Sequence, residues 1–253
     1  MGDLVKIDID WSCVALVELL KNYEFETVLD VGSGVGNHSR ILRMAGKKVF
    51  SMDKFVDAAD IKVDILDFET DQKFDCIFCS HVVEHQRNVG FFLDKIYSLL
   101  SDDGILCIAG PCHDPNLIVE GHLKTWTAAI ALQNLVLAGF DCSDALIYQI
   151  HETVVICKMA PIFEKTTASF KFINHALWPF EPALMKITNE MGHYINGSLS
   201  YPLTFVKNSS AGKIHKVKVK NGEVNQTFVA QSSRFFKDVF LFLDKEDEAI
   251  YKD

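Results

Sequence analysis

The feature that most constrains this fold is a glycine-rich turn between an apolar strand and a helix. The run Val28-Leu29-Asp30-Val31 leads into Gly32-Ser33-Gly34-Val35-Gly36, and residues 38–45 then have a helical pattern that ends at Gly46. Glycines at such a turn tolerate backbone conformations that other residues avoid, and they let a ligand approach the main chain closely. The turn therefore predicts a ligand site where the first strand of a sheet ends.

The spacing of the glycines argues against two common phosphate sites. A dinucleotide fingerprint needs G-x-G-x-x-G, whereas the third glycine here is Gly36 and Asn37 follows it. No lysine follows the turn, so a Walker-type phosphate loop is excluded as well. Asp30 at the mouth of the turn repels a pyrophosphate and attracts a cation. The turn thus suits a sulfonium cofactor with an amino-acid end, whose positive charge or α-amino group Asp30 can oppose.

Two further carboxylates occur at expected strand ends. Asp53 ends the second strand about 20 residues after the turn, where a carboxylate can accept hydrogen bonds from both ribose hydroxyls. Asp64 and Ile65 end a short third strand and place a polar acceptor and an apolar wall at the adenine edge. Three such features in order along the chain point to one nucleoside-containing cofactor.

Strand and helix patterns alternate through the first two-thirds of the chain. We expect strands at 27–31, 47–52, 61–65, 74–80, 105–109, 140–149 and 151–159, and helices at 11–21, 38–45, 88–100 and 125–138. Strands separated by helices and short turns indicate a mostly parallel sheet that is covered on both faces. The predicted fold class is therefore α/β.

The pattern changes after Pro161. We expect a helix at 178–191, a strand at 201–206, a hairpin formed by 213–220 and 223–230 around Asn221-Gly222, and a last apolar stretch at 235–243. Residues 161–253 are therefore predicted to form an α+β appendage to a domain of residues 1–160. Such an appendage can cap the acceptor site or form a contact between copies of the chain.

The composition limits which binding partners and which cellular compartment we expect. Hydrophobic residues make up 49% of the chain, which excludes disorder, and the formal net charge of −9 disfavours nucleic acid as a partner. The seven cysteines fall mostly in apolar runs, which is typical of reduced, buried thiols. No signal peptide and no apolar run long enough to span a membrane is visible. We expect a cytoplasmic protein without a membrane partner.

With these motifs the chain resembles the class I S-adenosylmethionine-dependent methyltransferases over roughly residues 10–160. The matching stretches are VLDVGSGVGN, SMDKF, VDILD, FDCIFCSHVVEH and GILCIAGP. The resemblance implies a Rossmann-like, seven-stranded sheet with its last strand antiparallel, and S-adenosyl-L-methionine over the carboxyl ends of its strands. The expected cofactor-binding residues are Asp30, Gly32, Ser33, Gly34, Gly36, Asp53, Lys54, Asp64, Ile65, Ser80 and His81.

Histidines are concentrated after the strands of the predicted sheet. Methyl transfer to a hydroxyl needs a group that removes a proton, and histidine is the usual one at neutral pH. The catalytic candidates are the four histidines that should lie at the carboxyl edge of the sheet: His81, His85, His113 and His122. His122 can alternatively cap a helix.

A metal site is considered and not expected. The run from His81 to His85 has the H-x-x-E-H spacing of an inverted zinc-protease motif, but the long catalytic helix and the third ligand are missing. In quinone-biosynthesis O-methyltransferases an acid-x-x-Glu-His segment at this place binds a divalent ion, and here His81 replaces the leading acid. We expect Glu84 and His85 to shape the loop, with a metal-binding or base role as the alternative.

The expected reaction is O-methylation of a small hydroxylated acceptor, such as a sugar of a bacterial surface polysaccharide or a nucleotide sugar. The stretch 110–140 resembles small-molecule and glycan methyltransferases. Trp126, Trp178, Tyr194 and Tyr201 are candidate stacking faces for sugar rings, although aromatic residues of this kind more often belong to the core. The alternatives are a quinone-like, phenol-like or nitrogen acceptor, or a non-catalytic binding protein that retains the fold.

Overall fold

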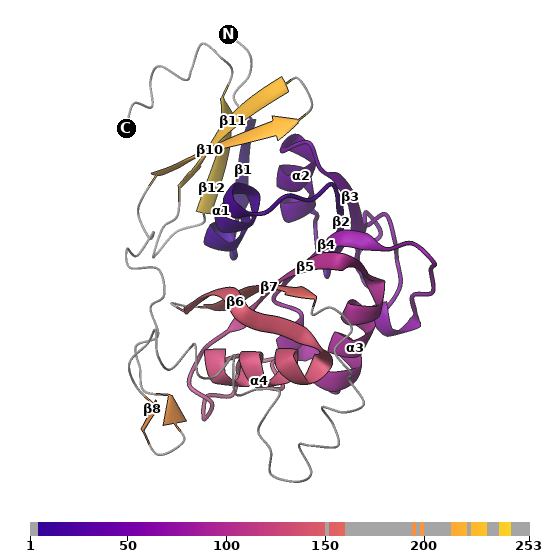
Figure 1. Ribbon diagram of the computed structural model, residues 1–253, viewed down its shortest axis with the longest axis vertical. Helices are drawn as coiled ribbons and strands as arrows, with labels where there is room; N and C mark the ends of the chain where they lie inside the picture. Colours follow the sequence, from indigo (N-terminus) through magenta and orange to yellow (C-terminus); the bar gives the residue numbers. More distant parts are fainter. Residues whose placement is uncertain are drawn as a thin grey trace.

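The computed structural model of the chain describes residues 5–149, 152–159, 194–195, 198–199, 214–221, 224–231 and 238–243 (Figure 1). The strands are β1 Val5–Ile9, β2 Thr27–Val31, β3 Lys48–Met52, β4 Phe74–Ser80, β5 Leu100–Pro111, β6 Phe140–Gln149, β7 Glu152–Met159, β8 Tyr194–Ile195, β9 Ser198–Leu199, β10 Ile214–Asn221, β11 Val224–Gln231 and β12 Asp238–Leu243. The helices are α1 Cys13–Asn22, α2 Asn37–Met44, α3 Val89–Leu99 and α4 Ala128–Ala138, with 3-10 turns η1 Ile65–Asp67 and η2 Val83–His85.

The central sheet has the strand order β3-β2-β4-β5-β7-β6. β3, β2, β4 and β5 are parallel, and β7 runs antiparallel to both of its neighbours. The predicted α/β class, the mostly parallel sheet and the antiparallel last strand are therefore confirmed. Parallel strands joined by helices bring the carboxyl ends of β2, β3 and β4 to one edge of the sheet.

Among the described residues this sheet has six strands, where seven were expected. The segment 61–65 makes a single parallel bridge, from Ile61 to Met52, and then turns into η1. Asp64 explains the turn, because its carboxylate accepts a hydrogen bond from the backbone N–H of Leu66. Such local side-chain bonds compete with the ladder of a strand.

Helices cover both faces of the sheet (Figure 1). α1 and α2 pack with Cys76 and Phe78 of β4 in one hydrophobic core, whereas α3 and α4 pack with Ile77 and Cys79 in another. The strand period of two thus sends the side chains of Cys76 and Cys79 to opposite faces. Both thiols are free, and burial raises the pKa of each.

A second, antiparallel sheet has the order β1-β12-β11-β10. The predicted hairpin is confirmed, since β10 pairs with β11 and Asn221 lies opposite Val224. β1 was not predicted, although Val5-Lys6-Ile7-Asp8-Ile9 alternates apolar and polar residues. Because β1 pairs with β12 and α1 contacts β10 and β11, the start of the chain is joined to its C-terminal strands. The expected elements at 178–191 and 201–206 lie outside the described residues.

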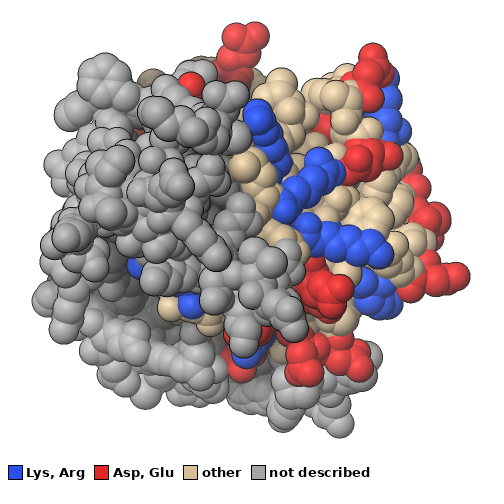
Figure 2. Space-filling view, turned by 90° about the horizontal axis from the view of Figure 1, so that it is seen from above, with Lys and Arg blue, Asp and Glu red and all other residues tan. Residues whose placement is uncertain are grey.

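The described surface carries charges of both signs. On the face seen from above in Figure 2, lysine and arginine side chains lie between aspartates and glutamates without a large patch of one sign. No helix in the described part of the chain is long and apolar enough to cross a membrane.

Candidate functional site

A pocket of about 360 Å³ lies at the carboxyl ends of β2, β3 and β4. Seven of the sequence-predicted site residues line it, and they are Gly32, Asp53, Lys54, Asp64, Ile65, His81 and His85. The remaining wall consists of Val31, Met52, Phe55, Val63, Val82 and Gln86. The pocket thus has apolar walls and a few polar groups at strand ends, as sites for small molecules usually do.

The glycine turn lies directly against the loop that follows β4. The backbone N–H groups of Gly32 and Ser33 both donate to the carbonyl of Met52, at 2.8 and 2.9 Å. Gly32 has a φ of +68°, and a Cβ built on it would lie 2.2 Å from Cγ2 of Val82. Only glycine therefore allows this approach of the two loops.

Asp53 connects the turn to the next loop. One of its carboxylate oxygens accepts a hydrogen bond of 3.0 Å from the N–H of Gly34, and the other accepts from the N–H groups of Phe55 and Val56. A carboxylate has about four acceptor positions. Asp53 can therefore hold both loops and still accept bonds from the hydroxyls of a ligand in the pocket.

Asp64 and Lys54 form the charged wall of the pocket. The ammonium of Lys54 lies 3.0 Å from the Asp64 carboxylate, and Asp64 also caps η1. Partial burial opposes ionisation of Asp64, but the N–H of Leu66 and the Lys54 ammonium outweigh it and lower its pKa. Ile65 beside it is buried and supplies an apolar surface.

Asp30 lies beneath the glycine turn and does not line the pocket. Its side chain is buried and accepts a hydrogen bond of 2.6 Å from the Ser39 hydroxyl. Burial raises the pKa of Asp30, and the nearby His38 and the Ser39 bond act in the opposite direction. Ser33 and Gly36 also lie outside the lining, where the Gly36 N–H donates to the Ser33 carbonyl at the start of α2.

His81 lies between two carboxylates. Its Nε2 is 3.1 Å from Oε2 of Glu152 and its Nδ1 is 3.1 Å from Oε1 of Glu84, while the indole of Trp11 stacks on the ring with centroids 4.8 Å apart. Burial would lower the pKa of His81, but the bonds to Glu152 and Glu84 raise it to about 9. His81 is therefore an imidazolium at neutral pH and has no free nitrogen to accept a proton.

Ser80 belongs to a buried polar network instead of the pocket wall. Its hydroxyl is 2.7 Å from the hydroxyl of Ser12, and Ser12 donates to both oxygens of Glu152 through its N–H and hydroxyl groups. Sequence reasoning missed Trp11, Ser12 and Glu152. No local signal connects them, because Ser12 and Glu152 are 140 residues apart.

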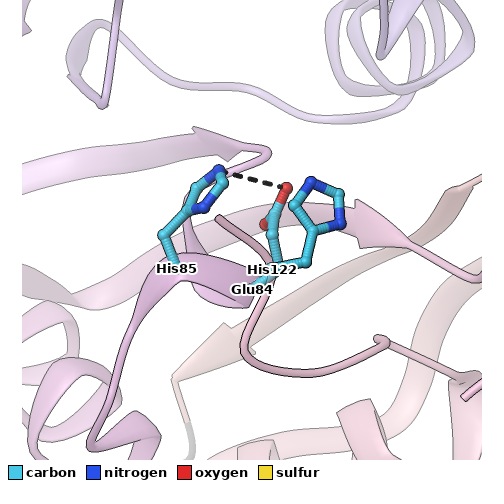
Figure 3. A group of neighbouring side chains, drawn as sticks. All are labelled: Glu84, His85 and His122. Carbon is cyan, nitrogen blue, oxygen red and sulfur yellow. Dashed lines mark ion pairs between the residues drawn. The ribbon is translucent and has the colours of Figure 1, made fainter. Parts of the chain in front are cut away.

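Two of the other three predicted catalytic histidines, His85 and His122, lie together with Glu84 (Figure 3). His85 comes from η2, and its ring centroid is 5.2 Å from that of His122. His122 also stacks on His113, with Nε2 of His113 3.2 Å from its Nδ1. Burial and the neighbouring histidines lower the pKa of His122 against the opposing effect of Glu84. His122 is thus neutral at pH 7.

One sequence interpretation is wrong. The side chain of Trp126 is fully buried in the core beneath α4, so it presents no stacking face to a ligand. Trp126 precedes the N-cap of α4, its backbone N–H donates to the carbonyl of Pro111, and its side chain packs in the core with Leu132 and Leu135 of α4. The side chains of Trp178, Tyr194 and Tyr201, and His151, His175, His193 and His215, lie outside the description of the structure.

Comparison with known proteins gives a family and two partial relatives. A family model described as a methyltransferase domain matches residues 13–153. The (S)-coclaurine N-methyltransferase of Papaver somniferum is 35% identical over 60 residues, which are 24% of this chain and 17% of that protein. The pavine N-methyltransferase of Thalictrum flavum subsp. glaucum is 27% identical over 106 residues, covering 35% of this chain and 30% of that protein. The chain therefore matches less than a third of the length of either relative.

Solved structures share the fold. The 1,6-didemethyltoxoflavin-N1-methyltransferase of Burkholderia thailandensis, solved with 1,6-didemethyltoxoflavin and S-adenosylhomocysteine, superposes with a TM-score of 0.50. The similarity covers 58% of this chain and 76% of that chain at 18% sequence identity. At that identity the likeness shows the architecture alone.

Proposed function

The chain belongs to the methyltransferase-domain family, as a class I S-adenosylmethionine-dependent methyltransferase, and from this premise we propose that it methylates a hydroxyl group of a small polyhydroxylated molecule. The observation that carries the proposal is the pocket at the strand ends, with Asp53 and Asp64 in its wall and the Glu84 and histidine cluster beside it. We propose a sugar or nucleotide sugar as the acceptor class.

The residues of the pocket fit S-adenosylmethionine. Gly32 holds the glycine turn against Val82, and both residues line the pocket. Asp53 and Asp64 supply acceptors for hydroxyl and amino groups, and Ile65 supplies an apolar wall. We propose that these residues hold the cofactor together with Gly34, Lys54 and His81, while Asp30, Ser33, Gly36 and Ser80 support the loops around it.

The chain's own residues have to position the acceptor and receive its proton. When bound, S-adenosylmethionine supplies a methyl group on a positively charged sulfur, and S-adenosylhomocysteine is left after transfer. His81 carries a proton already, so it does not serve as the base. We place removal of the hydroxyl proton at the cluster of His85, His113 and His122, next to the pocket. Such proton transfer contributes about 10²–10⁴-fold to a rate.

A nitrogen acceptor is the second candidate function. Both partial relatives are named N-methyltransferases, which favours an amine over a hydroxyl. A neutral amine already has a free lone pair and therefore depends less on a base. The two candidates thus differ in how strongly turnover depends on the histidine cluster.

Cofactor binding is the first test. Calorimetry with S-adenosylmethionine should show binding to the wild-type protein, and Asp53→Ala should weaken it at least about tenfold, the change in affinity that a loss of about 1.4 kcal/mol produces. Asp57→Asn is the matched control, because the Asp57 side chain is 88% exposed and pairs only with Lys62 in the described part. Absence of binding at millimolar cofactor would leave a non-catalytic binding protein as the remaining function.

The acceptor is the second test. Sugars, nucleotide sugars, phenols and their amine analogues should be incubated with cofactor that carries a deuterated methyl group, and products identified by mass spectrometry. We expect labelled hydroxyl products, and His85→Ala, His113→Ala or His122→Ala should lower turnover by more than about tenfold. Products methylated only at nitrogen would overturn the hydroxyl proposal and support the second candidate.

A further inference from the structure

Glu84, His85 and His122 form a compact set of metal-ligand groups. Their ligand atoms all lie within 4.8 Å of one another. Figure 3 shows the imidazoles of His85 and His122 on either side of the Glu84 carboxylate, which they approach from two different loops. The three side chains therefore meet only in the folded protein.

The buried Glu84 carboxylate is paired at one oxygen only, since Oε1 lies next to His81 whereas Oε2 has no partner among the described residues. Its side chain is fully buried, and neither oxygen has a well-directed hydrogen bond within the described residues. The nearest cationic or polar nitrogens are those of two histidines, with Nδ1 of His81 at 3.1 Å and Nε2 of His85 at 3.8 Å from Oε1. Buried charges are normally paired and hydrogen-bonded or coordinate metals. A carboxylate in this position points to a bound cation.

Hydrogen bonds made by Nδ1 of His85 and of His122 leave the Nε2 atom of each ring available to bind a metal ion. Nδ1 of His85 lies 2.8 Å from the carbonyl of Gly121, so we assign the proton to Nδ1 and the lone pair to Nε2. Nδ1 of His113 lies 2.9 Å from the carbonyl of Asp114, and its Nε2 lies 3.2 Å from Nδ1 of His122. The same logic gives His122 a protonated Nδ1 and a lone pair on Nε2. Backing of this kind is typical of metal-ligating histidines.

The ligand types select the class of metal. Two imidazoles and one carboxylate suit zinc and other first-row transition metals, whereas magnesium and calcium prefer oxygen ligands. Metal–ligand bonds of about 2.0–2.2 Å in tetrahedral geometry put ligand atoms about 3.3 Å apart. The 3.8 Å between Nε2 of His85 and Oε1 of Glu84, within a set whose ligand atoms span up to 4.8 Å, therefore has to shorten when a metal ion binds.

We propose that Glu84, His85 and His122 bind one divalent transition-metal ion, of the zinc type, whose open position takes an oxygen of the acceptor. The binding of an acceptor oxygen by the metal rests on the proposed function. His85 lines the cofactor pocket, so an ion held by His85 would lie beside that pocket. A bound metal lowers the pKa of a coordinated hydroxyl, so that its proton leaves to water near neutral pH. His85 and His122 then serve as metal ligands instead of acting as bases themselves. The sequence left a metal ion at Glu84 and His85 as an alternative only, and the structure adds His122 as a third ligand group.

Direct metal titration tests whether Glu84, His85 and His122 bind a metal ion. Untagged protein freed of metal with a chelator is titrated with Zn²⁺ by calorimetry and with Co²⁺ by visible absorption. We expect one equivalent bound and a Co²⁺ spectrum of nitrogen and oxygen ligation. His85→Ala, His122→Ala and Glu84→Gln should each weaken Zn²⁺ binding at least about tenfold. Loss of a residue that only hydrogen-bonds to a metal ligand already lowers metal affinity by about that factor.

Two control variants make the result specific. His38→Ala removes a histidine that contacts Trp11 and Phe78 outside the cluster, and Cys112→Ser removes the least buried of the seven thiols; neither should change the affinity. Circular dichroism and thermal unfolding establish that each variant is folded. No Zn²⁺ binding by the wild-type protein, or affinity unchanged in all three ligand variants, would overturn the site and leave a buried water as the partner of Glu84.

Calorimetry with S-adenosylmethionine on the same preparations separates the two proposals. Cofactor binding without Zn²⁺ binding overturns the metal site alone. Zn²⁺ binding without cofactor binding keeps the metal site and overturns the proposed function. If both bind, chelation should abolish methylation of a hydroxyl acceptor, and turnover unaffected by chelation would overturn the role of the ion in deprotonation.

Discussion

At the scale of single residues, Gly32 is the position where side-chain volume and backbone conformation both matter. Gly32→Ala puts a Cβ 2.2 Å from Cγ2 of Val82 and keeps a positive φ of 68°, so the two pocket loops have to move apart. We expect a lower midpoint of thermal unfolding and S-adenosylmethionine affinity reduced at least about tenfold, which corresponds to about 1.4 kcal/mol. Thermal melts and calorimetry measure the two effects.

Gly90 offers the matched control for that substitution. It lies in α3, has no positive φ, and a Cβ built on it meets nothing within 4 Å. Gly90→Ala should therefore stabilise the protein by about 0.5–1 kcal/mol through helix propensity, without changing cofactor affinity. Equal effects of the two glycine substitutions would contradict the role given to the Gly32 contact.

His81 gives a pH dependence with a definite sign. Its pKa is raised in the folded protein from 6.5 to about 9, mainly by Glu152 and Glu84 against the effect of burial. A raised pKa contributes stability that is complete below about pH 6.5 and is lost as the pH rises to about 9. The full contribution is on the order of 3 kcal/mol.

The comparison of wild type with His81→Asn isolates this effect. Asparagine tolerates the φ of +54° at this position, so the backbone is kept and the charge is removed. Urea unfolding at several pH values should show the largest difference in unfolding free energy near pH 6 and a small one near pH 10. A difference that stays constant from pH 6 to 10 would contradict a charged His81.

At the scale of elements, α4 depends on its N-cap residue, Thr127. The hydroxyl of Thr127 accepts a hydrogen bond of 3.4 Å from the N–H of Ile130, which satisfies one of the donors left open at a helix start. Thr127→Ala should cost about 0.5–1 kcal/mol of unfolding free energy, the lower end for such caps because the bond is long. Ser98→Ala, at the end of α3 on the surface, is the control and should change stability by less than about 0.5 kcal/mol.

At the scale of the whole molecule, β1 links the two ends of the chain. Ile7 in β1 is 2% exposed and belongs to the core formed by α1 and α2, while β1 itself pairs with β12. Ile7→Ala should therefore destabilise the whole protein by about 2–5 kcal/mol in urea unfolding. Leu137→Ala removes a similar side chain that is 48% exposed, and its effect should be much smaller.

The outcome of the Ile7 substitution bears on the organisation of the chain. A single, uniformly shifted transition fits a molecule in which both sheets unfold together. Two transitions, of which only one shifts, would contradict that view. We propose that residues 161–253 cap the acceptor site or join two copies of the chain, and light scattering of the purified protein distinguishes these roles through its mass.

The sequence by itself determined the central fold and the cofactor side of the site. β2 and β4 have the predicted bounds, and Gly32, Asp53 and Asp64 line one pocket as expected. These features are local, because strand period, turn glycines and residues at strand ends follow from neighbours in the sequence. Parallel topology then brings the strand ends together without further information.

Only the tertiary structure decided the rest. The charge of His81 depends on Glu152, the incompletely paired carboxylate of Glu84 depends on burial, and His122 reaches Glu84 from a distant loop. β1 could be recognised from its alternation, but its partner β12 could not. The physical reason is the same in each case: burial and electrostatics act through space between residues far apart in the chain, and only the folded chain sets those distances.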